Sequence, residues 1–182
     1  TIMQMDVGLD TGDMILKKSL PITSEDTGGT LHDKLSELGA ISIIEYLDSL
    51  EKDEFQRIKQ DESLANYAHK LSKNESNIDW SAEAETISRC VRAFNPWPVS
   101  YSSDQGERVR ILEAEAVDAP ASTTTSAPGT IIARDKHGIV VQCGQGALKI
   151  LKLQLPGSKA LNVADLINGG KPVVQLNSQL GQ

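Results

Sequence analysis

Cysteine, aromatic residues and long apolar runs are all scarce in this sequence of 182 residues. The two cysteines, Cys90 and Cys143, form no CxxC pair, which argues against a disulfide framework and against a cysteine-rich zinc site. No apolar stretch approaches the roughly 18 residues that a membrane-spanning helix needs. The first residues do not have the pattern of a signal peptide either. We therefore expect a cytoplasmic protein without a membrane partner.

Several signatures of enzyme active sites are also missing. The sequence contains no GxSxG, no Walker loop and no GxGxxG, so serine hydrolases, P-loop enzymes and the dinucleotide fingerprint have no local support. The three histidines, His32, His69 and His137, lack the neighbours of a zinc site or a catalytic triad. We expect no metal cofactor.

The charge of the chain is distributed unevenly. The net charge is −7, but residues 1–70 hold 7 Lys and Arg against 14 Asp and Glu, whereas residues 71–182 hold 11 of each. All of the net acidity therefore belongs to the first part, and the neutral second part is the one that can approach the phosphates of a nucleic acid. With only seven Phe, Trp and Tyr residues, stacking of single-stranded bases is not expected, whereas a folded RNA can be held by Lys and Arg.

The pattern of apolar residues predicts the local structure of the first part. Alternation predicts a strand at residues 1–5 and a second strand at residues 14–21. Polar residues 23–27 offer cap groups for a helix, in which apolar residues recur at helical spacing from Leu31 to about Leu50. A short helical stretch follows in the region from Leu64 to Leu71.

The second part is predicted to begin after a polar linker at residues 71–77. Ser81 is the expected N-cap of a helix that ends near Phe94, before Asn95 and Pro96. Trp80, Phe94 and Trp97 are expected to pack in a core. Runs rich in β-branched residues then predict strands at residues 99–102, 109–117, 130–133, 139–143 and 147–155. A short helix is predicted at residues 162–168, and a final strand at residues 173–176. Such a series suggests a barrel of the oligonucleotide-binding (OB) type.

The loop from Asp6 to Asp13 contains three carboxylates and two glycines between the first two strands. Asx-turns that use these side chains locally are one explanation. Hard oxygen ligation of a metal by Asp6, Asp10 and Asp13 is a weaker one, because no histidine is near in sequence. A site for a ligand is the third.

Two segments resemble a known family. The letters MDVGLDTGD at residues 5–13 resemble the signature loop of the folate-dependent formyltransferases. The letters RAFNPWP at residues 92–98 are similar to the start of the C-terminal domain in the methionyl-tRNA formyltransferase family. KLSK at residues 70–73 and IDW at residues 78–80 resemble the same family, so the match spans essentially the whole chain.

The resemblance implies an α+β chain in two parts. Residues 1–70 correspond to the strand–loop–helix end of a Rossmann-like formyltransferase domain, residues 71–77 to a linker, and residues 78–182 to an OB-like β-barrel domain that binds tRNA. The implied reaction transfers a formyl group from 10-formyltetrahydrofolate, the co-substrate, to the amino group of methionyl-initiator tRNA. The family's Asn-x-His pair and Ser-Leu-Leu-Pro segment do not occur in this sequence. We therefore expect the chain itself to be inactive, and we expect a monomer.

The resemblance also assigns residues. Asp10 matches the catalytic aspartate of the family motif, and Val7, Gly8 and Leu9 fall in the loop that borders the folate pocket. For contacts with tRNA, the candidates are the cations of the linker, the helix and one strand: Lys70, Lys73, Arg89, Arg92, Lys149 and Lys152. Simple alternation along residues 147–155 places Lys149 and Lys152 on opposite faces of that strand.

Two alternatives remain beside this assignment. Another folate-dependent formyltransferase with an appended domain, for example one acting on a nucleotide-linked amino sugar, shares the Asp-Thr-Gly loop, although the form FNPWP argues against it. A non-enzymatic RNA-binding barrel with an unrelated helical arm is the second, and in it Asp10 is only structural.

Overall fold

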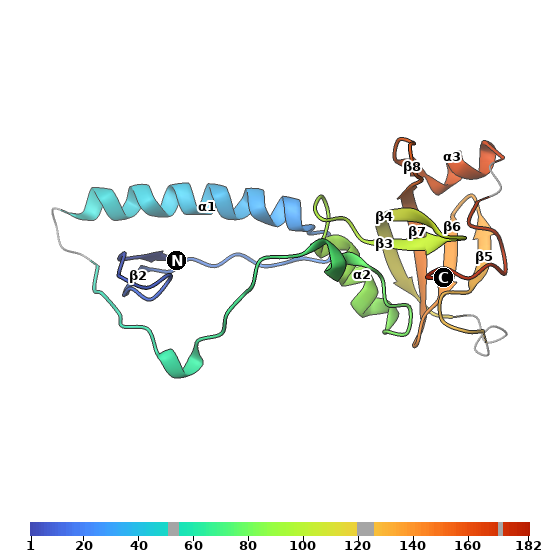
Figure 1. Cartoon of the computed structure of the whole chain (residues 1–182). Coiled ribbons are helices and arrows are strands. Elements are labelled where there is room, and N and C mark those ends of the chain that lie inside the picture. The colour runs from blue at the N-terminus through green and yellow to red at the C-terminus, as the bar shows by residue number, and fades with distance from the viewer. Residues whose placement is uncertain (51–54, 120–125, 171–172) are drawn as a thin grey trace. The chain divides into compact units, whose positions relative to one another are not determined.

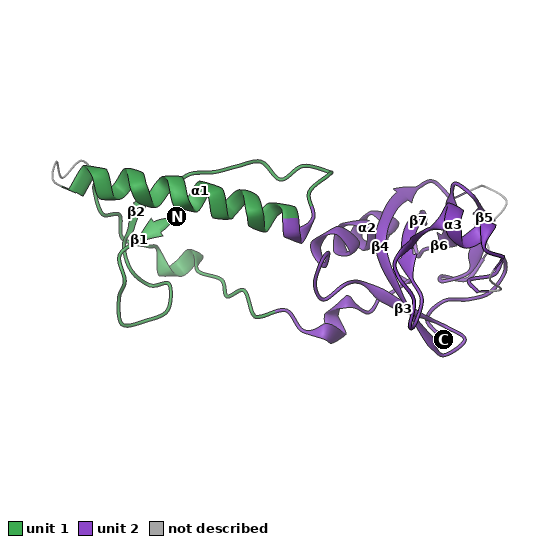
Figure 2. Ribbon diagram, turned by 90° about the horizontal axis from the view of Figure 1, so that it is seen from above, with its two compact units in different colours: residues 1–26, 30–70 green, residues 27–29, 71–182 purple. Residues whose placement is uncertain are grey.

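The computed structural model describes residues 1–50, 55–119, 126–170 and 173–182. It contains helices and antiparallel strands, with a short hairpin and one long helix first and most strands later in the chain (Figure 1). The described residues divide into two compact units, coloured separately in Figure 2. Unit 1 comprises residues 1–26 and 30–70, and unit 2 comprises residues 27–29 and 71–182.

Unit 1 is built from a small antiparallel hairpin and one long helix. Strand β1 (Ile2–Met3) pairs with β2 (Met14–Leu16), so both predicted strands form but are shorter than expected. The other side of β2 bonds to Ile58, with 2.8 Å between N and O in each direction. Helix α1 (Gly28–Ser49) has the predicted extent. The segment around Ile58 thus lies beside the strand that leads out of the Asp6–Asp13 loop.

Helix α1 exposes most of its apolar residues. Leu35, Ile41, Ile44 and Leu47 are each more than half exposed. Their helical spacing predicts the helix correctly, but the described residues bury little of this face. Tertiary packing normally supplies most of the stability of a protein helix, and the described residues leave this apolar face of α1 without a packing partner.

The prediction of a helix between Leu64 and Leu71 is wrong. Only a short 3₁₀ turn, η2 (Glu62–Leu64), forms there, and Asp61 caps it by accepting a hydrogen bond from the Ser63 N–H at 2.9 Å. Leu64 and Tyr67 are 77% and 73% exposed. Without a surface to pack against, so short an apolar pattern does not repay the cost of helix nucleation. A second 3₁₀ turn, η3 (Lys73–Ser76), follows in the expected linker.

In the described part of unit 2, six strands form one antiparallel sheet. Their order is β3–β4–β7–β6–β5, with β8 paired to β7. The sequence runs predict all of them except β8, and boundaries differ by only a few residues. The strands are β3 (Tyr101–Asp104), β4 (Glu107–Val117), β5 (Ile131–Asp135), β6 (Gly138–Gln142), β7 (Ala147–Gln154) and β8 (Leu161–Asn162). The path is open between β3 and β5, so the described strands do not close into the expected barrel.

Instead, the C-terminal segment bonds to both edges of this sheet. The Ile131 N–H of β5 donates to the Ser178 carbonyl at 2.9 Å, and the Gly181 N–H donates to the Ser103 carbonyl of β3 at 2.8 Å. The prediction of a final strand at residues 173–176 is wrong. The backbone hydrogen bonds to the two sheet edges come instead from residues farther along the chain, Ser178 and Gly181. An irregular segment thereby satisfies edge groups that would otherwise be open to another chain.

Helix α2 (Ala84–Ala93) begins later than predicted. Ser81 is not its N-cap, because the Ser81 N–H and hydroxyl both donate to the Asp79 carboxylate, at 2.9 and 2.6 Å. This Asx-type turn directs the chain into the helix three residues further on. The last helix, α3 (Val163–Asn168), has the predicted bounds, with Asn162 at the N-cap position and Gly169 after its end.

The core of unit 2 is formed by residues of the sheet, of helices α2 and α3 and of the C-terminal segment. It includes Ile111 and Leu148, which are fully buried, and Val91 from helix α2. Trp80 belongs to it, at 5% exposed, and its indole N–H donates to the Ser102 hydroxyl at 2.9 Å. The prediction that Trp97 also packs in a core is wrong. Its side chain is 55% exposed, because the turn after α2 places its ring outside this core.

None of the helices in the described ranges is both long and apolar enough to cross a membrane.

Candidate functional site

The Asp6–Asp13 loop connects β1 to β2 and has a defined backbone. The Gln4 N–H donates to the Asp13 carbonyl at 2.9 Å, which joins the two ends of the loop. Gly12 passes so close to Gln4 that a Cβ at this position would lie 1.7 Å from the Gln4 carbonyl oxygen. Asp10 has a positive φ of 57°, in the left-handed region that Asp tolerates better than most residues. The glycine and the aspartate therefore each meet a backbone requirement.

Gln60 holds this loop from fifty residues farther along the chain. Its side-chain amide Nε2 donates to the Asp10 carbonyl at 2.8 Å and to the Gly12 carbonyl at 2.7 Å. The pairing of Ile58 with Met14 brings Gln60 to this position. Sequence reasoning missed Gln60, since one glutamine in a charged, weakly patterned stretch has no signal that links it to a loop so distant in sequence.

The loop presents its side chains to solvent. Val7 is fully exposed and Leu9 is 87% exposed, although both are apolar. Asp10 is also exposed, and within the residues that the structure describes its carboxylate receives no hydrogen bond. Asp6 does make a local bond, at 2.7 Å from the Val7 N–H. A local Asx network therefore accounts for Asp6 but leaves the Asp10 carboxylate free to meet a ligand.

A metal site receives no support in the described ranges. No group of three or more His, Cys, Asp or Glu side chains there is arranged to hold a metal ion, and this includes Asp6, Asp10 and Asp13.

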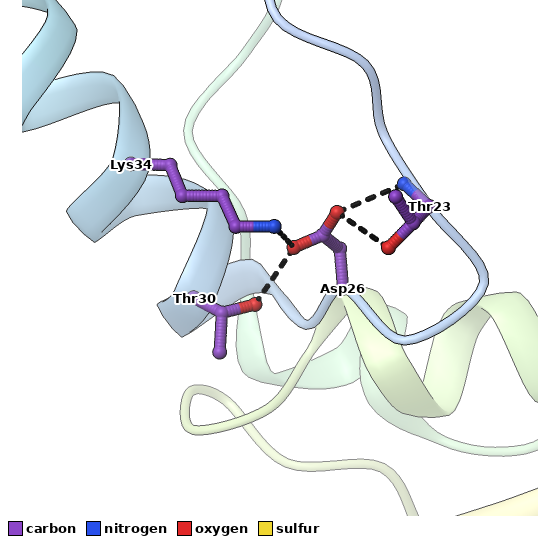
Figure 3. Close-up of polar contacts among 4 residues, drawn as sticks. All are labelled: Thr23, Asp26, Thr30 and Lys34. Atoms are coloured by element: carbon purple, nitrogen blue, oxygen red, sulfur yellow. Dashed lines mark hydrogen bonds and ion pairs between the residues drawn. The ribbon is translucent and has the colours of Figure 1, made fainter.

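Asp26 organises the turn that leads from the hairpin into α1 (Figure 3). Its Oδ2 accepts hydrogen bonds from the Thr23 N–H at 2.8 Å and from the Thr23 hydroxyl at 3.0 Å. Its Oδ1 accepts from the Lys34 ammonium at 2.6 Å and from the Thr30 hydroxyl at 3.2 Å. Lys34, and then the Thr23 N–H, hold the pKa of the Asp26 carboxyl well below its ordinary value. Through these side chains Asp26 ties the turn at Thr23 to the first two turns of α1.

The candidate tRNA contacts differ in their exposure and in their partners. Lys70 and Lys73 are exposed. Arg89 is paired with Glu85 one turn earlier on α2, with 3.2 Å between Nε and Oε1. Arg92 is half-buried and donates from Nη1 to the Ser88 hydroxyl at 3.2 Å. Of these four, the two lysines are the most accessible to an anion.

Lys149 and Lys152 lie on the same side of the sheet, so the prediction of opposite faces is wrong. Lys149 pairs with Glu115 at 3.0 Å and Lys152 pairs with Glu113 at 2.9 Å, across the β4–β7 ladder. The register shifts between these pairs, and Leu151 is skipped. Such a β-bulge adds one residue and reverses the alternation beyond it, which no count of two along the strand can anticipate.

Two family models match the chain. Residues 1–47 match the formyl transferase model, and residues 70–171 match the model for the formyl transferase C-terminal domain. The second match alone covers more than half of the chain. The chain belongs to the formyl transferase family. The exposed Asp10 loop lies within the first matched range, and the six-stranded sheet of unit 2 lies wholly within the second.

Relatives within this family are similar over the whole chain. The methionyl-tRNA formyltransferase of Marinobacter nauticus is 50% identical over 180 residues, which covers 99% of this chain and 57% of the relative. That of Hahella chejuensis is 49% identical, covering 99% and 56%, and that of Pseudomonas savastanoi is 45% identical, covering 100% and 56%. The chain therefore spans just over half the length of these curated formyl transferase relatives.

Solved structures support the fold. A variant of HypX from Aquifex aeolicus has a TM-score of 0.64 at 20% identity, covering 91% of this chain and 30% of HypX. HypX in complex with tetrahydrofolic acid also gives 0.64, at 18% identity, covering 91% and 29%. At this level of identity the likeness shows that the formyl transferase chain shares its fold with HypX.

Proposed function

We propose that this chain is part of an enzyme that transfers a formyl group from 10-formyltetrahydrofolate to the amino group of methionyl-initiator tRNA. The observation that carries the proposal is the Asp10 loop, with a free, exposed carboxylate, in a chain similar along its full length to methionyl-tRNA formyltransferases. The complex of HypX with tetrahydrofolic acid supports a folate-type co-substrate for this fold.

In this proposal Asp10 is the catalytic carboxylate. The methionyl amine attacks the formyl carbon as a neutral nucleophile, and the new C–N bond leaves a positive charge on that nitrogen. Asp10, directly or through a water molecule, accepts the proton that the nitrogen then gives up. Collapse of the adduct breaks the bond from the formyl carbon to the folate nitrogen, which takes up, as it leaves, the proton that the amine gave to Asp10. The geometry supports this role because the carboxylate is exposed while Gln60 fixes the backbone beneath it.

Val7, Gly8 and Leu9 are proposed to border the folate pocket. The exposed Val7 and Leu9 side chains offer apolar surface beside Asp10, which suits a flat aromatic ring. Gly8 adds no side chain of its own, and a Cβ there would lie 2.8 Å from the Thr11 side chain. These features agree with a loop that lies close to a ligand.

The two units are proposed to have different functions. Residues 1–70 are assigned to the end of a Rossmann-like catalytic domain, residues 71–77 to a linker, and residues 78–182 to an OB-like domain that binds tRNA. Lys70, Lys73, Arg89, Arg92, Lys149 and Lys152 are kept as candidate tRNA contacts. Of these, Lys70 and Lys73 are the best supported, because Arg89, Lys149 and Lys152 are engaged by glutamates.

Turnover is proposed to need groups outside this sequence. The oxyanion that forms during attack needs hydrogen-bond donors, and the family's Asn-x-His pair does not occur in these 182 residues. The chain alone is therefore expected not to transfer formyl groups. We assign it to the cytoplasm and expect it to be monomeric.

A hybrid enzyme tests the function. Residues 1–182 replace the matching part of the Marinobacter nauticus relative, and formylation of methionyl-initiator tRNA is measured with 10-formyltetrahydrofolate. The hybrid is expected to turn over. Its Asp10→Asn variant is expected to lose transfer, by about a thousandfold or more given the usual weight of a positioned proton acceptor, while the Kd for tRNA stays unchanged. Asp6→Asn is the matched control on the same loop.

Other outcomes select the alternatives. Transfer to an amino sugar nucleotide but not to methionyl-tRNA would favour another folate-dependent formyltransferase. Loss of tRNA affinity in Asp10→Asn, without any transfer by the parent hybrid, would favour an RNA-binding module.

A further inference from the structure

The outer side of the β3–β4 hairpin carries two cations that were not among the expected tRNA contacts. Arg108 and Arg110 stand at alternate positions of β4, opposite Ser103 and Tyr101 of β3. Both are exposed, whereas Val109 between them is buried. The alternation of side chains along a strand therefore places both guanidinium groups on the same, solvent-facing side of the hairpin.

Each arginine is held by a neutral partner. The Arg108 guanidinium carbon lies 3.9 Å from the centroid of the Tyr101 ring. Arg110 donates from Nη1 to the Gln154 side-chain oxygen at 3.3 Å. In the described part of the chain neither arginine makes an ion pair. These contacts limit the freedom of the two side chains but leave their charges uncompensated.

The two arginines border a hollow of about 240 Å³. Its remaining lining comes from Gln154, Leu155, Pro156 and Gly157, so no carboxylate lines this hollow. Two acidic residues, Asp104 and Glu107, line an adjoining hollow that shares Leu155 and Pro156. The position of a Cβ on Gly157 is open, with no atom within 4 Å. By contrast, another hollow at the end of α2 is lined by Glu83, Glu85 and Asp118, which would repel phosphate. Of these hollows, the one beside Arg108 and Arg110 is suited to an anion.

The neighbouring lysines on the same side of the sheet differ from the two arginines, because they already form ion pairs. Lys149 and Lys152 each meet a glutamate directly across the β4–β7 ladder. Before either could neutralise a phosphate, its ion pair would have to be exchanged, which offsets part of the gain. The arginines carry no such cost, so they would contribute more to binding a polyanion than the paired lysines.

The spacing of the arginines indicates the kind of anion. Side chains two residues apart on an antiparallel strand are separated by about 6.8 Å, comparable with the separation of consecutive phosphates along a nucleic-acid strand. The guanidinium fork also matches the geometry of phosphate oxygens. We propose that the outer side of the β3–β4 hairpin binds the sugar–phosphate backbone of the tRNA substrate, with Arg108 and Arg110 on neighbouring phosphates. This inference rests on the proposed function, which makes tRNA the substrate.

The test measures binding of the 182-residue chain to fluorescently labelled initiator tRNA by anisotropy, over a series of salt concentrations. The double variant R108Q/R110Q keeps both side-chain stems and removes both charges. Since each lost phosphate contact reduces the slope of log K against log salt by about 0.9, the slope is expected to fall by about 2. Affinity at low salt is expected to fall about tenfold or more. Both arginines are exposed, and circular dichroism verifies that the variant is folded.

The matched control is K149Q/K152Q, which removes the same two charges from the same side of the sheet. Because each of these lysines is already paired with a glutamate, the slope of K149Q/K152Q is expected to fall by clearly less than that of R108Q/R110Q. An unchanged slope in R108Q/R110Q, or a larger loss in K149Q/K152Q, would overturn the proposal. So would an equal loss of binding to anionic phospholipid vesicles, because it would show a general anion surface rather than an RNA contact.

The same variants in the hybrid enzyme separate this proposal from the proposed function. If the hybrid formylates tRNA and R108Q/R110Q leaves kcat/KM for tRNA unchanged, the proposed binding surface is wrong and the proposed function is retained. If the hybrid transfers nothing while R108Q/R110Q still lowers the salt slope of tRNA binding, the function fails and the surface stands.

Discussion

Replacing Gln60 by alanine should loosen the loop that carries Asp10. The substitution removes the two hydrogen bonds from Nε2 to the Asp10 and Gly12 carbonyls, which measure 2.8 and 2.7 Å. A neutral hydrogen bond contributes about 1 kcal/mol net, and both carbonyls can turn to water once Gln60 is gone, so the loop loses about 1–2 kcal/mol of stabilisation. Because 1.4 kcal/mol corresponds to a factor of about ten in a population, the ordered state of the loop should become roughly tenfold less favoured.

Hydrogen exchange measured on the 182-residue chain is the direct assay. Amides of residues 6–13 are expected to exchange about tenfold faster in Gln60→Ala. Gln60→Glu should have a larger effect, because a carboxylate cannot donate to two carbonyl oxygens and would face them with its own negative charge. The exposed Gln56 provides the matched control, and Gln56→Ala should leave exchange in the loop unchanged.

The hybrid enzyme gives a second measurement of the Gln60 effect. A positioning role predicts a lower kcat in Gln60→Ala with an unchanged KM for tRNA, because Gln60 orders Asp10 but lies outside the proposed tRNA contacts. If exchange in residues 6–13 is the same in Gln60→Ala, Gln56→Ala and the parent chain, the reasoning from the two hydrogen bonds is refuted.

Two further predictions concern unit 1. The pKa of Asp26 is depressed in the folded state, so its stabilising effect is present above the ordinary value of 3.8 and is lost as the pH falls below it; the helical signal in circular dichroism should therefore decline on acidification below about pH 4. Asp26→Asn should lower that signal already at neutral pH and flatten its pH dependence, and an unchanged titration would contradict this assignment. Gly12→Ala should destabilise the β1–β2 hairpin by about 1–3 kcal/mol, since its Cβ would meet the Gln4 carbonyl oxygen. Gly39→Ala on α1 has open space around it and should stabilise the helix by about 0.5–1 kcal/mol; hydrogen exchange compares the two, and equal effects would exclude the steric argument.

Local patterns in the sequence predict much of the secondary structure. Apolar spacing after Leu31 predicts α1 with its observed extent, and residues 105–106 end β3 in a two-residue turn with positive φ at both positions. Both signals are local, because a helix face and a tight turn depend on residues within a few positions of one another. The same local signals fail near Leu64, where an apolar pattern has no surface to pack against.

The Asp10 loop is likewise visible in the sequence, because its letters resemble a family motif and the family models match the chain. The role of Gln60 is not visible there, since a hydrogen bond across fifty residues depends on the pairing of Ile58 with Met14. For a similar reason, the sequence does not show that Lys149 and Lys152 lie on the same side of the sheet. A bulge in the β4–β7 ladder, rather than the sequence of β7 alone, places both lysines beside glutamates.

For this protein, the sequence by itself determined most of the elements, the family and the candidate catalytic aspartate, because propensity, periodicity and motif letters are properties of short segments. Only the tertiary structure decided which charges are neutralised and which are free. Lys149 and Lys152 meet glutamates across a ladder, whereas Arg108 and Arg110 meet a tyrosine ring and an amide. Pairing of this kind depends on strand register and bulges, which bring together residues far apart in the chain.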